Sequence, residues 1–244
     1  MRKKESTWNM KYIKYVLMLL VVLGIGASSA AQAQSGTWYF KHFSTNGPIY
    51  PWYSNDNSWG YHATWGSGFV EMVMGEDWGT FSPYHPIPKQ IYNVGSGAWS
   101  WFWENHQVYG GGRIDSTWDN FIDYAPASNR QGTEIMIWAN YQNTQPIADQ
   151  YNSSGQAVPH YYWQYIGGRY WNIYEYHWNN SPYWTLTFID QQQQGGESIP
   201  MMQFVNWGVN HGFYGNNWYL MEIGAGWEYA NGWASATSYG NVNY

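Results

Sequence analysis

Apolar residues recur mostly at every second position along the chain, in short segments separated by glycine, asparagine, serine and proline. A period of two is typical of a β-strand with one buried face. The segments that we expect to be strands are rich in Trp, Tyr, Thr, Val and Ile, and they span residues 37–42, 69–74, 99–103, 117–123, 134–141, 161–166, 169–177, 184–189 and 218–224. The pattern predicts an all-β fold, either an antiparallel sandwich or a barrel.

One segment, 198–212, has a helical period instead. Met201, Phe204, Val205 and Val209 recur at the spacing of one helix face, after Ser198 as a candidate N-cap and before glycine at position 212 as a stop. We therefore expect a single helix, packed on the outside of a sheet.

The first 33 residues have the pattern of a secretory signal peptide. A basic region precedes an apolar run of about a dozen residues, and small residues ending in Ala31-Gln32-Ala33 follow it. Removing this leader takes away five of the ten basic and one of the sixteen acidic residues, so the mature chain has a net charge of −10. We expect a protein secreted to the extracellular space or the periplasm, with no disulfides because there is no cysteine.

The charge and the ring content narrow the class of partner. A chain this acidic repels nucleic acid and anionic membranes, so neither is an expected partner after leader cleavage. The 19 Trp and 24 Tyr are more large rings than a core of this size can hide. Such rings suit a wet groove that stacks on sugar faces, although many of them will be core residues and cross-strand pairs.

Two segments place a glutamate among aromatic strand residues. In the first, alternation puts Glu134, Met136, Trp138 and Asn140 on one face, with isoleucine and alanine on the other. A carboxylate beside a Met and a Trp fits a ring-lined cleft, or else a sheet edge. In the second, Glu228 follows glycines at 224 and 226 that let another strand approach closely.

Paired carboxylates are the minimum for glycoside hydrolysis, in which one attacks the anomeric carbon or activates water and the other protonates the leaving oxygen. Glu222 and Glu175 are rival candidates, since both also lie in aromatic strands.

Five motifs in order along the chain resemble glycoside hydrolase family 12, the compact endoglucanases and xyloglucan hydrolases. These motifs are Asn57-Ser58-Trp59-Gly60, Glu134-Ile135-Met136-Ile137-Trp138, Pro146-Ile147, Gly167-Gly168 with Trp171, and Gly226-Trp227-Glu228. The resemblance covers nearly all of residues 34–244, which it identifies as one catalytic domain.

The resemblance implies roles for individual residues. Glu134 matches the nucleophile, Glu228 the acid/base, and Asp123 an aspartate that hydrogen-bonds the nucleophile. Asn57, Trp59, Met136, Trp138 and Pro146 match substrate-binding positions, with Trp59 stacking on a sugar ring. The implied fold is a β-jelly roll of two curved antiparallel sheets with one α-helix and an open concave cleft.

Other chemistries find less support. The seven histidines have no metal-site spacing, there is no EF-hand or G-x-S-x-G pattern, and no cofactor is predicted. A structural calcium ion on loop carboxylates stays open, as do a carbohydrate-binding lectin-like module and a xylanase on the same fold. The sequence predicts a monomeric, retaining endo-hydrolase of soluble β-1,4-glucans.

Overall fold

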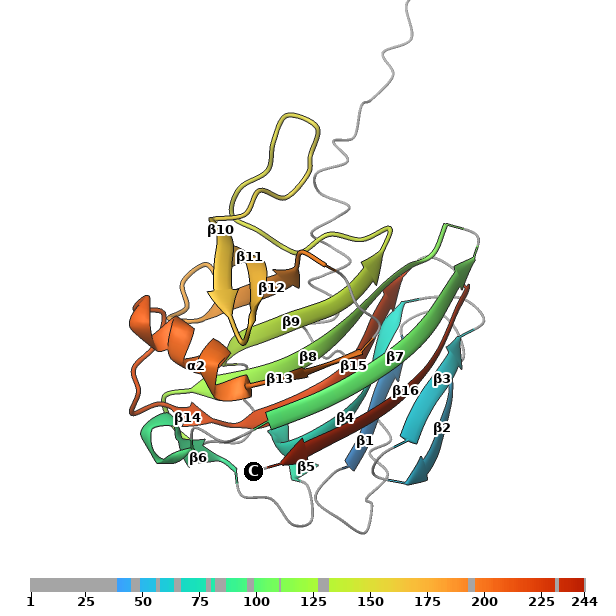
Figure 1. Ribbon diagram of the computed structural model, residues 1–244, viewed down its shortest axis with the longest axis horizontal. Coiled ribbons are helices and arrows are strands. Elements are labelled where there is room, and N and C mark those ends of the chain that lie inside the picture. Colours follow the sequence, from blue (N-terminus) through green and yellow to red (C-terminus); the bar gives the residue numbers. More distant parts are fainter. Residues whose placement is uncertain are drawn as a thin grey trace, which may run out of the picture.

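The computed structural model describes residues 39–44, 49–55, 58–63, 67–77, 80–81, 87–95, 99–109, 111–126, 132–192, 196–230 and 233–243. These residues form two β-sheets and one α-helix, which confirms the expected mainly-β jelly roll (Figure 1). The predicted leader and Asn57 lie outside the described residues.

The large sheet has eleven strands. Its main path, from one edge to the other, is β1 (Tyr39–Ser44), β4 (Gly68–Asp77), β15 (Glu222–Ala230), β8 (Arg113–Asp123), β9 (Thr133–Gln142), β12 (Trp184–Asp190), β11 (Arg169–His177) and β10 (Tyr161–Ile166). The short strands β5 (Thr80–Phe81), β6 (Lys89–Gln90) and β14 (Tyr219–Leu220) pair beside this path, and the one-turn 3-10 helix η1 (Ile91–Asn93) follows β6.

The small sheet has five strands, in the order β13 (Gly196–Ile199), β7 (Trp99–Tyr109), β16 (Trp233–Asn243), β3 (Ser58–Ala63) and β2 (Ile49–Asn55). Its strands β7 and β16 lie over β8 and β15 of the large sheet (Figure 1). All its strand pairs are antiparallel.

The core lies on one face of the large sheet because the residues of its strands alternate between faces along most of their length. Ile135 and Ile137 of β9 are fully buried on this face, together with Trp118, Trp171 and Trp227 from β8, β11 and β15. Burying rings of this size is the main source of stability in a chain that has no disulfides. The residues that alternate with these along each strand therefore point to the opposite face of the sheet.

One pair in the large sheet corrects the expectation of wholly antiparallel sheets. Strand β12 runs parallel to β9, with Thr185 opposite Glu134 and Ile189 opposite Trp138. Parallel neighbours need a long connection, and here residues 143–183 supply it, with β10 and β11 inside the connection. The expected strand at 218–224 also differs, since β14 and β15 divide it at Met221.

The helix α2 (Met201–Asn210) begins later than expected. Ser198 belongs to β13, opposite Trp101, so Pro200 precedes the helix without a side-chain cap. The expected stop is confirmed, because Gly212 has a φ of 80° and Phe213 N–H donates to the Gly208 carbonyl. Phe204 and Trp207 pack the helix against the core. No helix in the described part of the chain has the length and apolar character needed to cross a membrane.

Candidate active site

The face of the large sheet that points away from the core, called the site face below, carries several acidic side chains. The strand registers fix its members. Glu134 of β9 lies opposite Phe121 of β8, Glu228 of β15 lies opposite Asp115 of β8, and Asp119 is opposite both Met136 and Gly224. Because residues alternate between faces, all of these side chains point the same way.

Glu134 and Glu228 interact although they are not direct cross-strand neighbours. Their partners on β8, Phe121 and Asp115, are six positions apart, which is about 20 Å along a strand. The sheet is curved (Figure 1), so the direct distance between the two residues is shorter than the path along the strand. The negative charge of Glu134 raises the pKa of Glu228, so ionisation of Glu134 makes Glu228 harder to ionise.

Glu134 is held by a hydroxyl group on the parallel strand. Thr185 donates from Oγ1 to Glu134 Oε2 at 2.8 Å, and Trp178 Nε1 donates to the same hydroxyl at 3.0 Å. Burial raises the pKa of Glu134 from 4.5 to about 7, the Thr185 hydrogen bond opposes that rise, and the charge of Glu71 adds to it. Thr185 therefore stabilises the ionised form of this carboxylate.

Glu228 lies in a more strongly acidic setting. Burial, then the charges of Glu134 and Glu71, raise its pKa to about 8. Its backbone N–H donates to the buried carboxyl group of Asp115, whose own pKa burial raises well above the ordinary value. Of the two carboxyl groups, Glu228 thus has the higher pKa and keeps its proton to higher pH.

A third carboxylate, Glu71, lies near Glu134 and Glu228. Glu71 of β4 is buried and pairs with Lys41 of β1 at 3.7 Å, and Lys41 also lies over the ring of Phe69. Gly224 and Gly226 make room for this group, since a Cβ at Gly224 would lie 2.8 Å from Glu71 Oε2. The close approach predicted for these glycines is confirmed.

The structure also separates Glu228 from its rivals. Glu222 is fully buried, and neither of its carboxyl oxygens has a hydrogen-bond partner among the described residues, whereas Glu228 is partly exposed. Glu175 alternates with Tyr174 and so lies on the face opposite the site, where it accepts from His160 Nδ1 at 2.6 Å. Of the three glutamates, only Glu228 is both on the site face and reachable from solvent.

Asp123 is buried at the end of β8. Its Oδ1 accepts from Tyr183 Oη at 3.1 Å and from the Ala125 N–H at 3.3 Å, and its charge acts on Glu76. Burial, with the charge of Glu134 as a further cause, raises the pKa values of Asp119 and Asp115, earlier on the same strand, well above the ordinary value. Asp119 and Asp123 each lie two positions from Phe121, the partner of Glu134 on β8, so the role that the resemblance gives Asp123 stays a prediction.

Met136 and Trp138 lie on the site face, as the alternation predicted, but they are buried, with exposed fractions of 2% and 1%. The partly exposed rings of Tyr141 and Tyr174 pack on them. Asn140 does not share this face, because a register shift at Ser116/Thr117 brings Tyr141 there instead. Met136 and Trp138 thus form a floor under two tyrosines.

The remaining predicted binding residues are less informative. Trp59 lies on β3 of the small sheet, opposite Ser238 of β16, and only its backbone is described. Pro146 is buried in the connection after β9, where the side chain of Gln145 hydrogen-bonds to Gly155 and Ala157. Stacking by Trp59 and substrate contact by Pro146 stay predictions.

Asp119, Asp115, Glu71, Lys41 and Thr185 were missed by the sequence analysis. Alternation in 117–123 already placed Asp119 on the face of Thr117 and Phe121, and this signal could have found it. The other four depend on which strands pair. Within the described ranges, no group of three or more His, Asp or Glu side chains is arranged to hold a metal ion.

Comparison with solved structures shows which fold this is. No family model and no curated protein matches the sequence. The xyloglucanase domain of a type three effector from Sinorhizobium fredii, solved with cellobiose, matches with a TM-score of 0.71 at 18% identity, over 89% of this chain and 96% of that one. A family 12 xyloglucanase from Bacillus licheniformis matches with a TM-score of 0.73 at 16% identity, over 89% and 97%.

An endo-1,4-β-glucanase described as a cellulase matches with a TM-score of 0.68 at 23% identity, over 88% of this chain and 97% of that one. These matches run across nearly the whole length of both chains, and several of the matched structures are family 12 glycoside hydrolases. The chain has the β-jelly-roll fold of the family 12 glycoside hydrolases.

Proposed function

We propose that this protein is a secreted, monomeric, endo-acting retaining glycoside hydrolase that cleaves internal β-1,4 bonds of soluble β-glucans. The observation that carries the proposal is the pair Glu134 and Glu228, two interacting carboxylates on the site face with different proton affinities. The family 12 fold across nearly the whole chain supports the reaction class. Export rests on the leader pattern in residues 1–33.

In the proposed mechanism Glu134, in its ionised form, attacks the anomeric carbon while the bond from that carbon to the leaving oxygen breaks. Glu228 gives its proton to the leaving oxygen. In the second step Glu228 takes a proton from water, the water oxygen attacks the anomeric carbon, and the bond to Glu134 breaks. The higher pKa of Glu228 and the hydroxyl donor on Glu134 suit these roles.

The mutational test exchanges each carboxylate for its neutral isostere. Glu134→Gln and Glu228→Gln should each lower kcat on a soluble glucan by roughly a thousandfold or more, since each removes a step that the other residue does not perform. Thermal melts should show that both variants fold. Near-full activity in Glu228→Gln, with loss in Glu222→Gln, would contradict the assignment, and Glu175→Gln serves as a control glutamate outside the site.

The substrate test is a panel of carboxymethyl cellulose, barley β-glucan, xyloglucan and xylan, with product sizes followed over time. We expect mid-sized oligomers early in the reaction on one of the three glucans, and retained anomeric configuration by NMR. Preference for xylan would shift the proposal to a xylanase. Binding without new reducing ends at acidic and neutral pH would favour a lectin-like module.

A further inference from the structure

Four rings on the β10–β11 hairpin are exposed without an evident role in folding. Tyr162, Trp163 and Tyr165 on β10 and Tyr170 on β11 have exposed fractions of 53%, 62%, 67% and 49%, and we call them the aromatic platform. The other face of the same hairpin already packs on the core, through Trp171 against Phe204 of helix α2. A contiguous exposed apolar patch of this kind marks a binding surface more often than a structural need.

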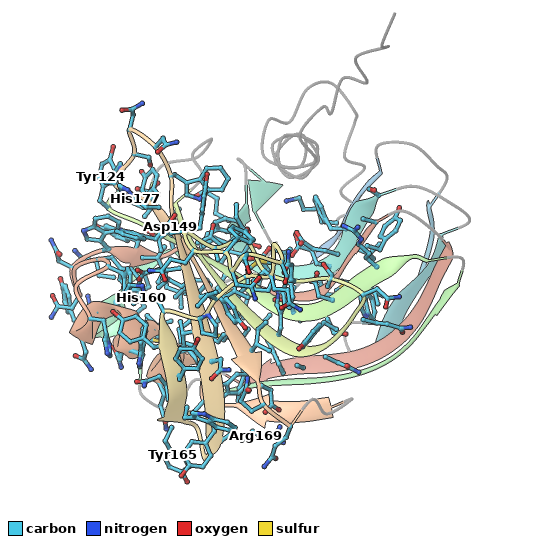
Figure 2. The ribbon with its side chains drawn as sticks, turned by 90° about the horizontal axis from the view of Figure 1, so that it is seen from above. Tyr124, Asp149, His160, Tyr165, Arg169 and His177 are labelled. Atoms are coloured by element: carbon cyan, nitrogen blue, oxygen red, sulfur yellow. The ribbon has the colours of Figure 1, made fainter. Side chains whose placement is uncertain are left out.

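The platform lies on the site face. Tyr170, Asn172 and Tyr174 alternate with the buried Trp171 and Ile173, so they point away from the core. Tyr165 is directly opposite Tyr170, with ring centroids 5.1 Å apart. In Figure 2 Tyr165 and Arg169 lie at the turn of the hairpin, far from His177 at the other end of β11.

The platform is connected to the candidate active site by further tyrosines. The ring of Tyr141 lies 5.7 Å from that of Trp138, in the strand that carries Glu134. Tyr174 of β11 packs with Tyr141 on the buried cluster of Met136 and Trp138. Tyr170 lies on the same face of β11 four positions earlier, opposite Tyr165. Rings therefore continue from β9 across the site face to the edge strand β10.

A backbone feature directs Trp163 outward. The pairing of β10 with β11 shifts register between Tyr161 and Gln164, and Trp163 has a φ of 54°, an unfavourable conformation for a large side chain. The Trp163 N–H donates to Asn172 Oδ1 at 3.0 Å, and Asn172 Nδ2 donates to Gln191 Oε1 at 3.0 Å. Strain that is held in place by such a clamp, at an exposed ring, is typical of a functional position.

The chemistry of the platform indicates its ligand. Tyrosine and tryptophan present flat apolar faces with polar edges, which match the faces and hydroxyls of a pyranose ring. The one cation in the hairpin, Arg169, is paired with the buried Asp190 at 2.6 Å, so it is a poor site for an anionic polymer. The ligand class is thus a neutral polysaccharide.

We propose that the aromatic platform is an outlying binding surface for the β-glucan chain, which holds the polymer beyond the residues at the cleavage point. This inference rests on the proposed function for its ligand class. It implies that the platform acts on polymers and not on the shortest oligosaccharides, because β10 is three strands from β9, about 14 Å across the sheet, and one or two sugar units bound at Glu134 do not span that distance.

The experiment measures polymer binding apart from hydrolysis. Affinity electrophoresis is run in gels that contain one of three neutral glucans: hydroxyethyl cellulose, barley β-glucan or xyloglucan. The parent is the Glu134→Gln variant, which should bind the glucan without cleaving it. Trp163→Gly removes the ring and suits the positive φ, and Tyr165→Ala with Tyr170→Ala removes two more rings. Tyr92→Ala is the matched control, a tyrosine 57% exposed in the short helix η1.

We expect platform variants to bind at least one glucan roughly tenfold more weakly and the Tyr92→Ala control to bind like the parent. With Glu134 restored, KM for that polymer should rise by a similar factor, while kcat/KM on a short chromogenic oligosaccharide stays within about twofold. Thermal melts check folding.

Several results would overturn the inference: platform variants that bind like the parent, a parent that none of the three glucans retards, or a dimer in sedimentation that the platform variants dissociate. These results distinguish a failure of the hydrolase proposal from a failure of the platform inference. If the native chain cleaves no glucan but binding depends on the platform, the hydrolase proposal fails and the platform stands. If hydrolysis is normal and platform variants bind like the parent, only the platform fails.

Discussion

Thr185 is the residue on which the ionisation of Glu134 depends most directly, since its hydroxyl hydrogen bond opposes the rise in pKa that burial causes. Thr185→Val removes that donor at constant shape, so the pKa of Glu134 should rise further above about 7. A nucleophile must be ionised, and a higher pKa leaves less of it ionised at a given pH. The acid limb of the kcat/KM profile should therefore move to higher pH by roughly one unit.

Two variants make this result specific. Thr185→Ser keeps the hydroxyl and should restore the profile. Thr187→Val changes a buried threonine two positions along β12, whose hydroxyl has no hydrogen-bond partner among the described residues, and should leave the acid limb in place. An acid limb that does not move in Thr185→Val would show that this limb reports a group other than Glu134.

Asp119 and Asp123 offer a direct comparison between structure and resemblance. Burial and then the charge of Glu134 raise the pKa of Asp119 well above its ordinary value, so Asp119 binds its proton more tightly once Glu134 ionises. Asp119→Asn keeps this neighbour uncharged, and the acid limb should therefore move by less than about half a unit. Asp123→Asn tests the role implied by the family motif. A larger shift of the acid limb in that variant, measured on the same polymer, would support an interaction between Asp123 and Glu134.

Among single residues, the sequence predicted Glu134 and Glu228, whose charge is unusual among large apolar side chains. It missed residues such as Thr185, which only the pairing of strands brings to the site. Glu134 and Glu228 stand out because a carboxylate between large rings is costly unless it has a use. Thr185 lies 51 positions from Glu134 and contacts it through a parallel strand pair that no local pattern encodes. The motif led to Asp123, at the end of β8, whereas Asp119, on which the charge of Glu134 acts, is opposite Met136 in the register.

At the scale of elements, β15 depends on glycine for its fit between β4 and β8. A Cβ on Gly226 would lie 2.0 Å from the Val70 carbonyl oxygen and 2.6 Å from the Glu71 Cα, both backbone atoms of the paired strand. Gly226→Ala should therefore lower the free energy of unfolding by about 3 kcal/mol or more. Urea unfolding measures this loss as a lower midpoint with similar slope.

The control is Gly95→Ala, where no heavy atom lies within 4 Å of the added Cβ. It should change stability by less than about 1 kcal/mol. If Gly226→Ala is as stable as this control, β4 and β15 can move apart without a loss in the free energy of unfolding. The close approach of these two strands would then not require glycine at position 226.

Element existence was predictable, but element ends and partners were not. Alternation located segments of all the long strands of the large sheet, because each buries one face. It could not show that Ser198 belongs to β13 and not to helix α2, since the partner of Ser198 in the sheet is Trp101, 97 positions away in the sequence. Nor could it show the register shift that replaces Asn140 by Tyr141, because a bulge is set by the partner strand.

For the whole molecule, the acidic site face has a cost in stability that depends on pH. Folding raises the pKa values of Glu71, Asp115, Asp119 and Glu222, and it raises those of Glu134 and Glu228 to about 7 and about 8. Between the ordinary carboxyl value of 4.5 and these raised values, the folded chain holds protons that the unfolded chain has released. Stability should therefore fall as pH rises from 5 to 8.

The expected loss is at least about 4 kcal/mol, since one pKa unit corresponds to about 1.36 kcal/mol, the raised pKa of Glu228 alone spans about three units above pH 5, and the other groups add to it. Chemical denaturation at pH 5, 6, 7 and 8 measures it. A free energy of unfolding that stays flat or rises over this range would show that the site acids are ionised and paired in the folded protein.

The contribution of Glu222 to the pH dependence of stability can be measured separately. It is fully buried, neither of its oxygens has a hydrogen-bond partner in the described part of the chain, and burial is the main cause of its raised pKa. A neutral amide of the same shape removes the titration without removing a known contact. Glu222→Gln should match the parent at pH 5 and exceed it in stability at pH 8, so that its stability falls less steeply with pH. If the variant is instead less stable than the parent at pH 8, the Glu222 carboxylate is ionised there and has a partner, and the site face holds more negative charge than burial predicts.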